Sequence, residues 1–239
     1  MAEGPQVREQ DLTGEFARIE RAVDGGDTDL SALGFWRLVK RVKLSPEAVE
    51  RYGEQVGRID AAVFGRAVSR RFPVWLGNAV LTAGVAAGAL AIVFALRVSS
   101  PLLSGLGLVA AGGLWSVSFH DLAHWLVGRL VGIRFTDYFI GGPPPPRPGL
   151  KTDYASYLRT PAEHRAWMHA SGAIATKVAP FLPLLFWSAS GAPVWSALIL
   201  LAIGALMIVS DMLFSVRSSD WKKVLRERAI AREVEALNE

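Results

Sequence analysis

Two histidines four residues apart stand in the most apolar part of this chain. They are His120 and His124, and Asp121 follows the first of them directly. On a helix, residues i and i+4 share one face, so both imidazoles can reach a single metal ion. No side chain from Val98 to Phe119 is charged, and ionisable groups within a membrane-spanning stretch are usually functional. The pattern predicts a metal site inside a membrane.

Asp211 is the expected third ligand, because it is the only charged residue from Val178 to Val216. At ~1.5 Å per residue, Asp211 lies roughly 9 Å and His120 roughly 13 Å from the basic residues that mark the same membrane boundary. Two histidines and one carboxylate, with a fourth position for water, form the ligand set of a catalytic zinc. Zinc lowers the pKa of such a water and polarises a carbonyl, and the neighbouring Asp121 is placed to take the proton.

Lys177 is the alternative partner for Asp211, because a lone carboxylate in hydrocarbon needs a positive charge nearby. By the same helical rise of ~1.5 Å, Lys177 lies about 18 Å from the boundary residue Arg165, a depth difference of about 9 Å from Asp211. Tilt or bending of the helices could close that gap. The sequence favours metal binding by Asp211 and predicts that Lys177 is not its structural partner. His169 is expected at the membrane interface.

The composition is that of a membrane protein, with 51% hydrophobic residues and a mean hydropathy of +0.28 over 239 residues. Four apolar stretches are long enough to cross a bilayer, at residues 73–96, about 102–130, about 166–190 and about 194–216. Basic residues precede the first stretch, separate the second from the third and follow the fourth. The positive-inside rule therefore predicts a multi-pass protein of the cell membrane with both termini cytoplasmic. Cysteine is absent, so only His, Asp or Glu can hold a metal.

The expected fold is an all-α polytopic membrane protein with a short extended segment after the second span. Residues 1–72 form a mostly helical cytoplasmic region, residues 73–217 a four-span domain, and residues 218–239 a charged cytoplasmic helix. Residues 1–72 hold equal numbers of acidic and basic side chains, so the net charge of +4 flanks the membrane, which indicates a lipid bilayer partner and no nucleic acid. Residues 33–44 alternate apolar and basic side chains, and either pack on neighbouring helices or lie on the membrane surface.

Three stretches resemble the site-2 protease family of intramembrane metalloproteases. The segment 120–124 is similar to the family motif His-Glu-x-x-His, with Asp121 in place of the glutamate. Gly172–Thr176 resembles a small-residue motif on an intermediate span, with threonine where the family has asparagine. Asp211 resembles the zinc-binding aspartate that the family carries on a later span. The resemblance covers roughly residues 75–220.

The resemblance implies a Zn²⁺-dependent metallopeptidase that hydrolyses peptide bonds in or near transmembrane segments of partner proteins. It implies that residues 135–140 present an extended edge to which substrate adds. The roles that follow are zinc binding by His120, His124 and Asp211, general-base catalysis by Asp121, and support of substrate or transition state by Gly172, Thr176 and Lys177.

The aspartate at position 121 leaves the activity open. Its side chain is one methylene shorter than glutamate, which would place the carboxylate about 1–1.5 Å further from the metal-bound water, and such a displacement can cost roughly a hundredfold in rate. A helix shift or an intervening water could restore catalysis. Alternatively, the protein is an inactive pseudo-protease that acts as a membrane chaperone or regulator. A membrane oxidase or desaturase ranks lower, because it needs more than the four histidines present.

Overall fold

The computed structural model describes residues 5–141, 147–213 and 219–238. The chain forms two compact units. The first unit comprises Met1–Phe72, Gly132–Ala162 and Ala229–Glu239, and the second comprises Pro73–Val131 and Glu163–Arg228. Both units are therefore assembled from stretches that are separate in the sequence.

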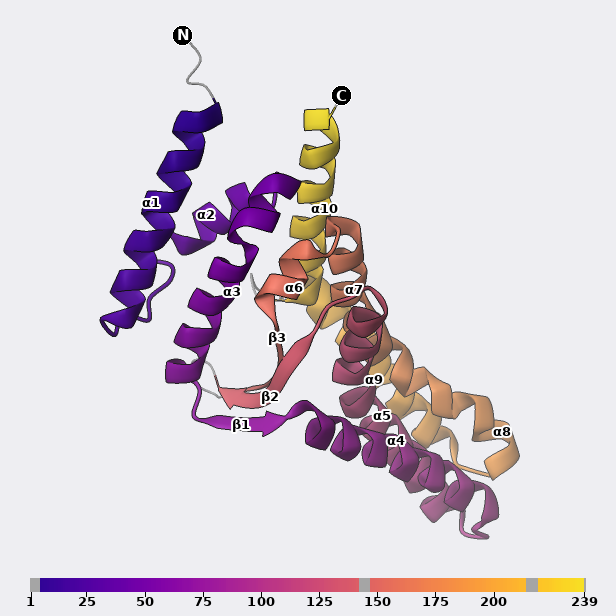
Figure 1. The fold of residues 1–239 in the computed structure, drawn as a ribbon. Helices are drawn as coiled ribbons and strands as arrows, with labels where there is room; N and C mark the ends of the chain where they lie inside the picture. The colour runs from indigo at the N-terminus through magenta and orange to yellow at the C-terminus, as the bar shows by residue number, and fades with distance from the viewer. Residues whose placement is uncertain (1–4, 142–146, 214–218, 239) are drawn as a thin grey trace. The chain divides into compact units, whose positions relative to one another are not determined.

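Helices form the core of the first unit (Figure 1), and they are α1 (Pro5–Asp24), α2 (Phe35–Val42), α3 (Pro46–Ala67) and α6 (Tyr154–Arg159). Helix α3 begins after Ser45, whose Oγ accepts a hydrogen bond from the Ala48 N–H at 3.1 Å, and a proline occupies the first turn. A serine N-cap followed by proline in the first turn is a common start of an α-helix. The rings of Phe16 and Tyr52 pack 5.5 Å apart in the interior and join α1 to α3.

Helix α2 decides between the two interpretations of residues 33–44. Four of its five apolar residues are buried in the core of the first unit, and they are Phe35, Leu38, Val39 and Val42, whereas Trp36 is exposed. On its exposed side, Lys40 forms an ion pair with Glu233 at 3.2 Å. The alternation of apolar and basic residues therefore reflects a helix that packs on its neighbours.

A three-stranded sheet completes the first unit, in the order β1 (Arg70–Pro73), β2 (Phe135–Gly141), β3 (Arg147–Thr152), with β2 and β3 antiparallel. The extended segment expected after the second span is present as β2. The prediction that it forms an open edge is wrong, because β2 has a neighbour on each side and the outer strands are β1 and β3. The proline run at 142–146 lies outside the described residues.

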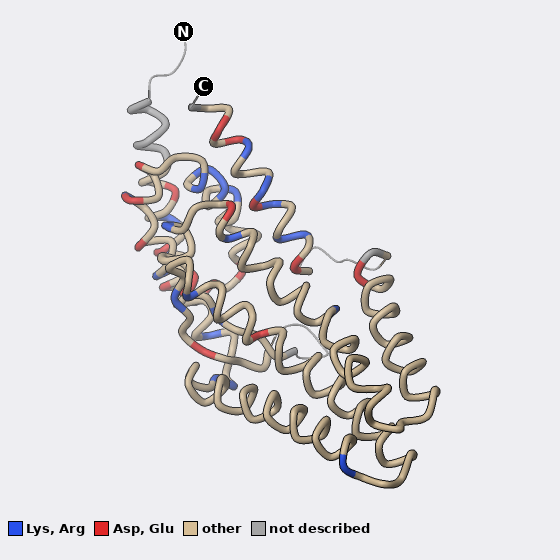
Figure 2. Tube along the Cα trace, turned by 90° about the vertical axis from the view of Figure 1, so that its right-hand side faces the viewer, with Lys and Arg blue, Asp and Glu red and all other residues tan. Residues whose placement is uncertain are grey.

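Among its described residues, the second unit has four helical stretches long and apolar enough to cross a membrane, as the sequence predicts. These are α4 (Val74–Arg97), α5 (Pro101–Leu130), the stretch Ala162–Ser190 that begins with α7, and α9 (Val194–Leu213). Figure 2 shows them almost free of charged residues. The expected end of the fourth span near Val216 lies outside the described residues. The start of α10 (Asp220–Asn238) also belongs to this unit.

The third span is not one continuous α-helix. Helix α7 (Ala162–Val178) passes into a 3₁₀ helix, η1 (Ala179–Phe186), and then into α8 (Trp187–Ser190). Pro180 and Pro183 lie in η1, and proline lacks the N–H that continues α-helical hydrogen bonding. Helix α7 therefore ends at Val178, one residue after Lys177.

Small residues let the spans approach closely. A Cβ at Gly88 of α4 would lie 2.3 Å from Trp115 Nε1 of α5, and that nitrogen donates a hydrogen bond to the Val85 carbonyl at 3.0 Å. A Cβ at Gly112 of α5 would lie 2.5 Å from the side chain of Leu200 of α9. Large apolar side chains elsewhere on the spans are exposed, which fits contact with a lipid bilayer. Helix α5 is thereby fixed between its neighbours.

Candidate metal centre

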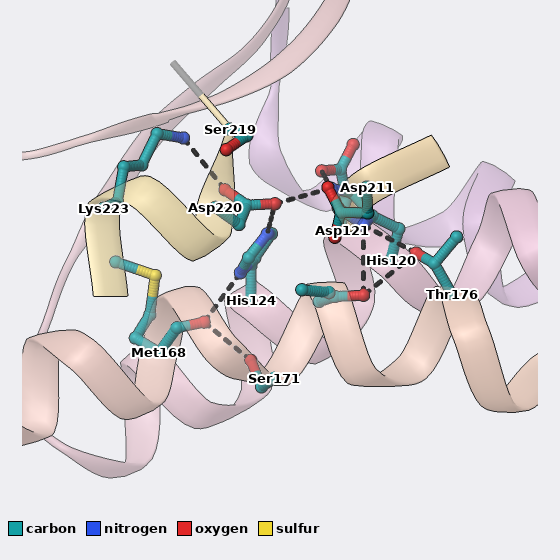
Figure 3. Close-up of polar contacts among 12 residues, drawn as sticks. His120, Asp121, His124, Met168, Ser171, Thr176, Asp211, Ser219, Asp220 and Lys223 are labelled. Carbon is teal, nitrogen blue, oxygen red and sulfur yellow. Dashed lines mark hydrogen bonds and ion pairs between the residues drawn. The ribbon is translucent and has the colours of Figure 1, made fainter. Parts of the chain in front are cut away.

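Three side chains on two helices form a candidate metal centre, here called the His–His–Asp cluster (His120, His124 and Asp220; Figure 3). The two histidine rings lie one turn apart on α5, with centroids separated by 4.7 Å. Asp220 Oδ2 lies 3.2 Å from His124 Nε2 and 3.5 Å from His120 Nε2. The three ligand atoms lie within 4.8 Å of one another, so the cluster could hold a metal ion. The ring of His169 is 6.3 Å from that of His124 and is not part of the cluster.

The Nδ1 atom of His124 is committed to a hydrogen bond with helix α7. It lies 2.7 Å from the Met168 carbonyl oxygen. A carbonyl oxygen only accepts, so Nδ1 carries the hydrogen and a neutral ring presents the lone pair of Nε2 to Asp220. A lone pair facing a carboxylate requires a proton or a metal cation between them.

The Nδ1 atom of His120 is oriented in the same way. It lies 2.8 Å from Thr176 Oγ1 and 3.1 Å from the Gly172 carbonyl oxygen. Thr176 Oγ1 donates its own hydrogen to the same carbonyl at 2.9 Å, so it accepts from Nδ1. Metal-binding histidines typically donate their second ring N–H to a carbonyl, which fixes the ring and the tautomer. Both Nε2 atoms therefore face the metal position.

Gly172 allows α7 to lie against the histidines. A Cβ at this position would lie 2.3 Å from Nε2 of His124, a contact that real Cβ atoms do not make. Any larger residue would displace the ring or push α7 away. Gly172 and Thr176, which were expected to support the substrate or transition state, contact the two histidines of the cluster.

Asp211 does not join the His–His–Asp cluster. Its Oδ2 forms an ion pair with Lys177 Nζ at 2.6 Å, and Lys177 also donates to the Ala173 carbonyl at 3.1 Å. The prediction that Lys177 is not the partner of Asp211 is therefore wrong. The depth estimate failed because it took Arg165 as a marker of the membrane boundary, whereas the Arg165 side chain is only 3% exposed and forms an ion pair with Glu227.

Asp220 is the candidate ligand that the sequence reasoning missed, because it lies at the start of the charged C-terminal helix rather than in a span. Burial tends to raise the pKa of Asp220. The hydrogen bond and positive charge that His124 supplies when a proton occupies its Nε2, together with Lys223 at 2.9 Å, hold this pKa well below its usual range. The carboxylate is therefore ionised and suited to bind a cation. The apolar residues Trp221 and Val224, which follow at helical spacing, were the available signal that this part of the tail docks on the membrane unit.

Comparisons with protein-family models, with curated proteins and with solved structures found no match to this chain. A function can therefore be proposed only from the chemistry of its own residues. The side chains that line the space next to the cluster belong to that chemistry, because they would contact any bound molecule.

A cavity of about 280 Å³ adjoins the cluster. It is lined by His120, Ala173, Thr176, Lys177, Met207, Ser210, Asp211, Ser219 and Asp220. The carboxylate of Asp121 lies 4.0 Å from Nε2 of His120, on the side that faces the metal position (Figure 3). The cavity is thus bordered by two residues of the cluster, by the Lys177–Asp211 ion pair and by the hydroxyl groups of a threonine and two serines. The Asp121 carboxylate lies near the same histidine.

Proposed function

We propose that the chain is a zinc-dependent intramembrane peptidase that cleaves peptide bonds in or near transmembrane segments of partner proteins. The observation that supports this most is the His–His–Asp cluster at a membrane helix, with both Nε2 atoms oriented toward an ionised carboxylate. Nitrogen and oxygen ligands of this kind suit zinc and leave a position for water. Zinc there would lower the pKa of the water and polarise a peptide carbonyl.

The remaining polar residues have roles in this proposal that follow from their positions. Asp121 takes the proton of the attacking water and passes it to the leaving amine, since its carboxylate lies 4.0 Å from a metal-facing nitrogen. Lys177 and Thr176 line the adjoining cavity. The Lys177 ammonium has a third hydrogen that it can donate to the substrate, whereas the Thr176 hydroxyl supports the site by orienting His120. The apolar spans limit the access of water, which strengthens each electrostatic contact.

A pseudo-protease is the second candidate, favoured by the short side chain at position 121. Such a protein would bind zinc and a membrane partner without shortening the partner. The two candidates share the metal centre and differ only in proton transfer, so a cleavage assay separates them.

Removal of the metal should abolish cleavage by this enzyme. The full chain, purified and placed in lipid vesicles with a transmembrane substrate that carries helix-weakening residues, should lose activity after chelation and regain it with Zn²⁺. Fragment masses measure the cleavage. The His120→Ala/His124→Ala variant, prepared in parallel, is the control for a contaminating protease. Undiminished cleavage by the chelated protein or by the double variant would contradict the proposal.

We further propose a cell-membrane location with both termini cytoplasmic, from the distribution of basic residues around the spans. Because the chain has no cysteine, single cysteines can report the topology. In intact cells a membrane-impermeant thiol reagent should label Ser99→Cys, between the first two spans, and should label Ala236→Cys only after lysis. Labelling of Ala236→Cys without lysis would show that the C-terminus lies outside the cell and would contradict the proposed orientation.

A further inference from the structure

Asp220 lies at the start of the polar helix α10, and contacts between α10 and α7 hold it near the histidines. Ser219 directly precedes α10, and its carbonyl oxygen and Oγ accept hydrogen bonds from the N–H groups of Lys223 and Lys222, respectively. Val224, one turn later, is 2% exposed and lies in a cluster with Ala166 and Ala170 of α7. These apolar contacts hold α10 against α7, but apolar contacts are not directional and do not by themselves define a position along that helix.

A buried ion pair fixes the position of α10 along α7. Arg165 Nε lies 2.6 Å from Glu227 Oε2, and the two side chains are 3% and 5% exposed. Glu227 follows Asp220 by seven residues, so the two share a helix face and lie roughly 10.5 Å apart along the axis. The directional bond to Glu227 therefore sets where Asp220 stands.

Helix α7 orients the histidines as well. The Met168 carbonyl fixes His124, and the Gly172 carbonyl with Thr176 fixes His120. Helix α7 therefore contacts both histidines through residues 168–176, and it contacts the helix that carries Asp220 through Arg165 in its first turn.

We propose that Arg165 and Glu227 are positioning residues of the metal centre, an inference that rests on the proposed metal-binding function. An apolar pair could hold the two helices together as firmly as a buried ion pair. It could not fix their register, and a slide of about 1 Å would take the carboxylate out of the ~2.0–2.2 Å range of a zinc–oxygen bond.

The test replaces the pair without leaving a buried charge. The full-length Arg165→Met/Glu227→Leu variant should keep its helical circular dichroism and elution volume. Its affinity for Zn²⁺ and Co²⁺ should fall roughly 10- to 100-fold, the usual effect of losing a partner that orients a metal ligand. The visible absorption of bound Co²⁺ should change, which a purely structural role of the pair would not cause. Glu235→Gln, at an exposed glutamate of the same helix, should match wild type.

A second variant covers failure of the first to fold. Glu227→Asp keeps the charge but shortens the side chain, so α10 must shift to keep the pair, and the Co²⁺ spectrum should change with the fold intact. Wild-type affinity and an unchanged spectrum in the folded variants would overturn the positioning role alone. Absence of Zn²⁺ and Co²⁺ binding by wild type would overturn both this inference and the proposed function.

Discussion

Replacement of Asp220 by alanine should remove zinc from the purified protein, whereas loss of Asp211 should leave the metal in place. Asp220 Oδ2 lies within 3.5 Å of both metal-facing nitrogens, and Asp211 is committed to Lys177. Loss of a residue that only orients a ligand costs roughly 10–100-fold in metal affinity, so loss of the ligand itself should cost more than about 100-fold. Titration of the apoprotein with zinc measures the effect.

The matched control is Asp211→Asn/Lys177→Met, which removes a carboxylate from the same cavity without leaving an unpaired charge. It should bind zinc with wild-type affinity. If this variant loses zinc while Asp220→Ala keeps it, Asp211 is the ligand after all.

Conversion of Asp121 to asparagine should lower the cleavage rate by about 10²- to 10⁴-fold, the usual contribution of a general base. Zinc content should stay at the wild-type level, because Asp121 is not in the His–His–Asp cluster. Asp121→Glu, one methylene longer, should bring the carboxylate about 1–1.5 Å closer to the water and raise the rate by up to roughly a hundredfold. Both rates come from substrate cleavage in vesicles with saturating zinc.

The two variants also separate the active enzyme from the pseudo-protease. Full activity of Asp121→Asn would remove the general-base assignment. Cleavage by Asp121→Glu together with none by wild type would identify the natural chain as a zinc-binding pseudo-protease. His120→Ala is the metal-free control for both measurements.

The four spans could be predicted because long apolar stretches are a strong local signal, and no packing detail alters it. The histidine pair was equally local, since the spacing from His120 to His124 alone places both rings on one helix face. The break in the third span was not predicted, although its cause, Pro180 and Pro183, is equally local. These features depend on residues that are neighbours in the chain.

The third ligand could not be predicted because its position depends on tertiary contacts. Asp220 reaches the histidines from α10, which packs on α7 through Val224 and Glu227. Arg165 misled the depth estimate for the same reason, since a basic residue near a span usually marks the interface but here is buried against Glu227. A charged residue near a span can mark the membrane interface or can be buried in an ion pair, and distance along the sequence does not distinguish the two cases.

The most direct test of the metal centre is zinc-edge X-ray absorption on the zinc-loaded full chain. The spectrum should fit one zinc per chain with two imidazole nitrogens at about 2.0–2.1 Å and carboxylate or water oxygens at about 2.0–2.2 Å. The His120→Ala/His124→Ala variant should lose the signal. A wild-type protein without bound zinc, or a double variant with the same spectrum, would contradict the assignment of this site.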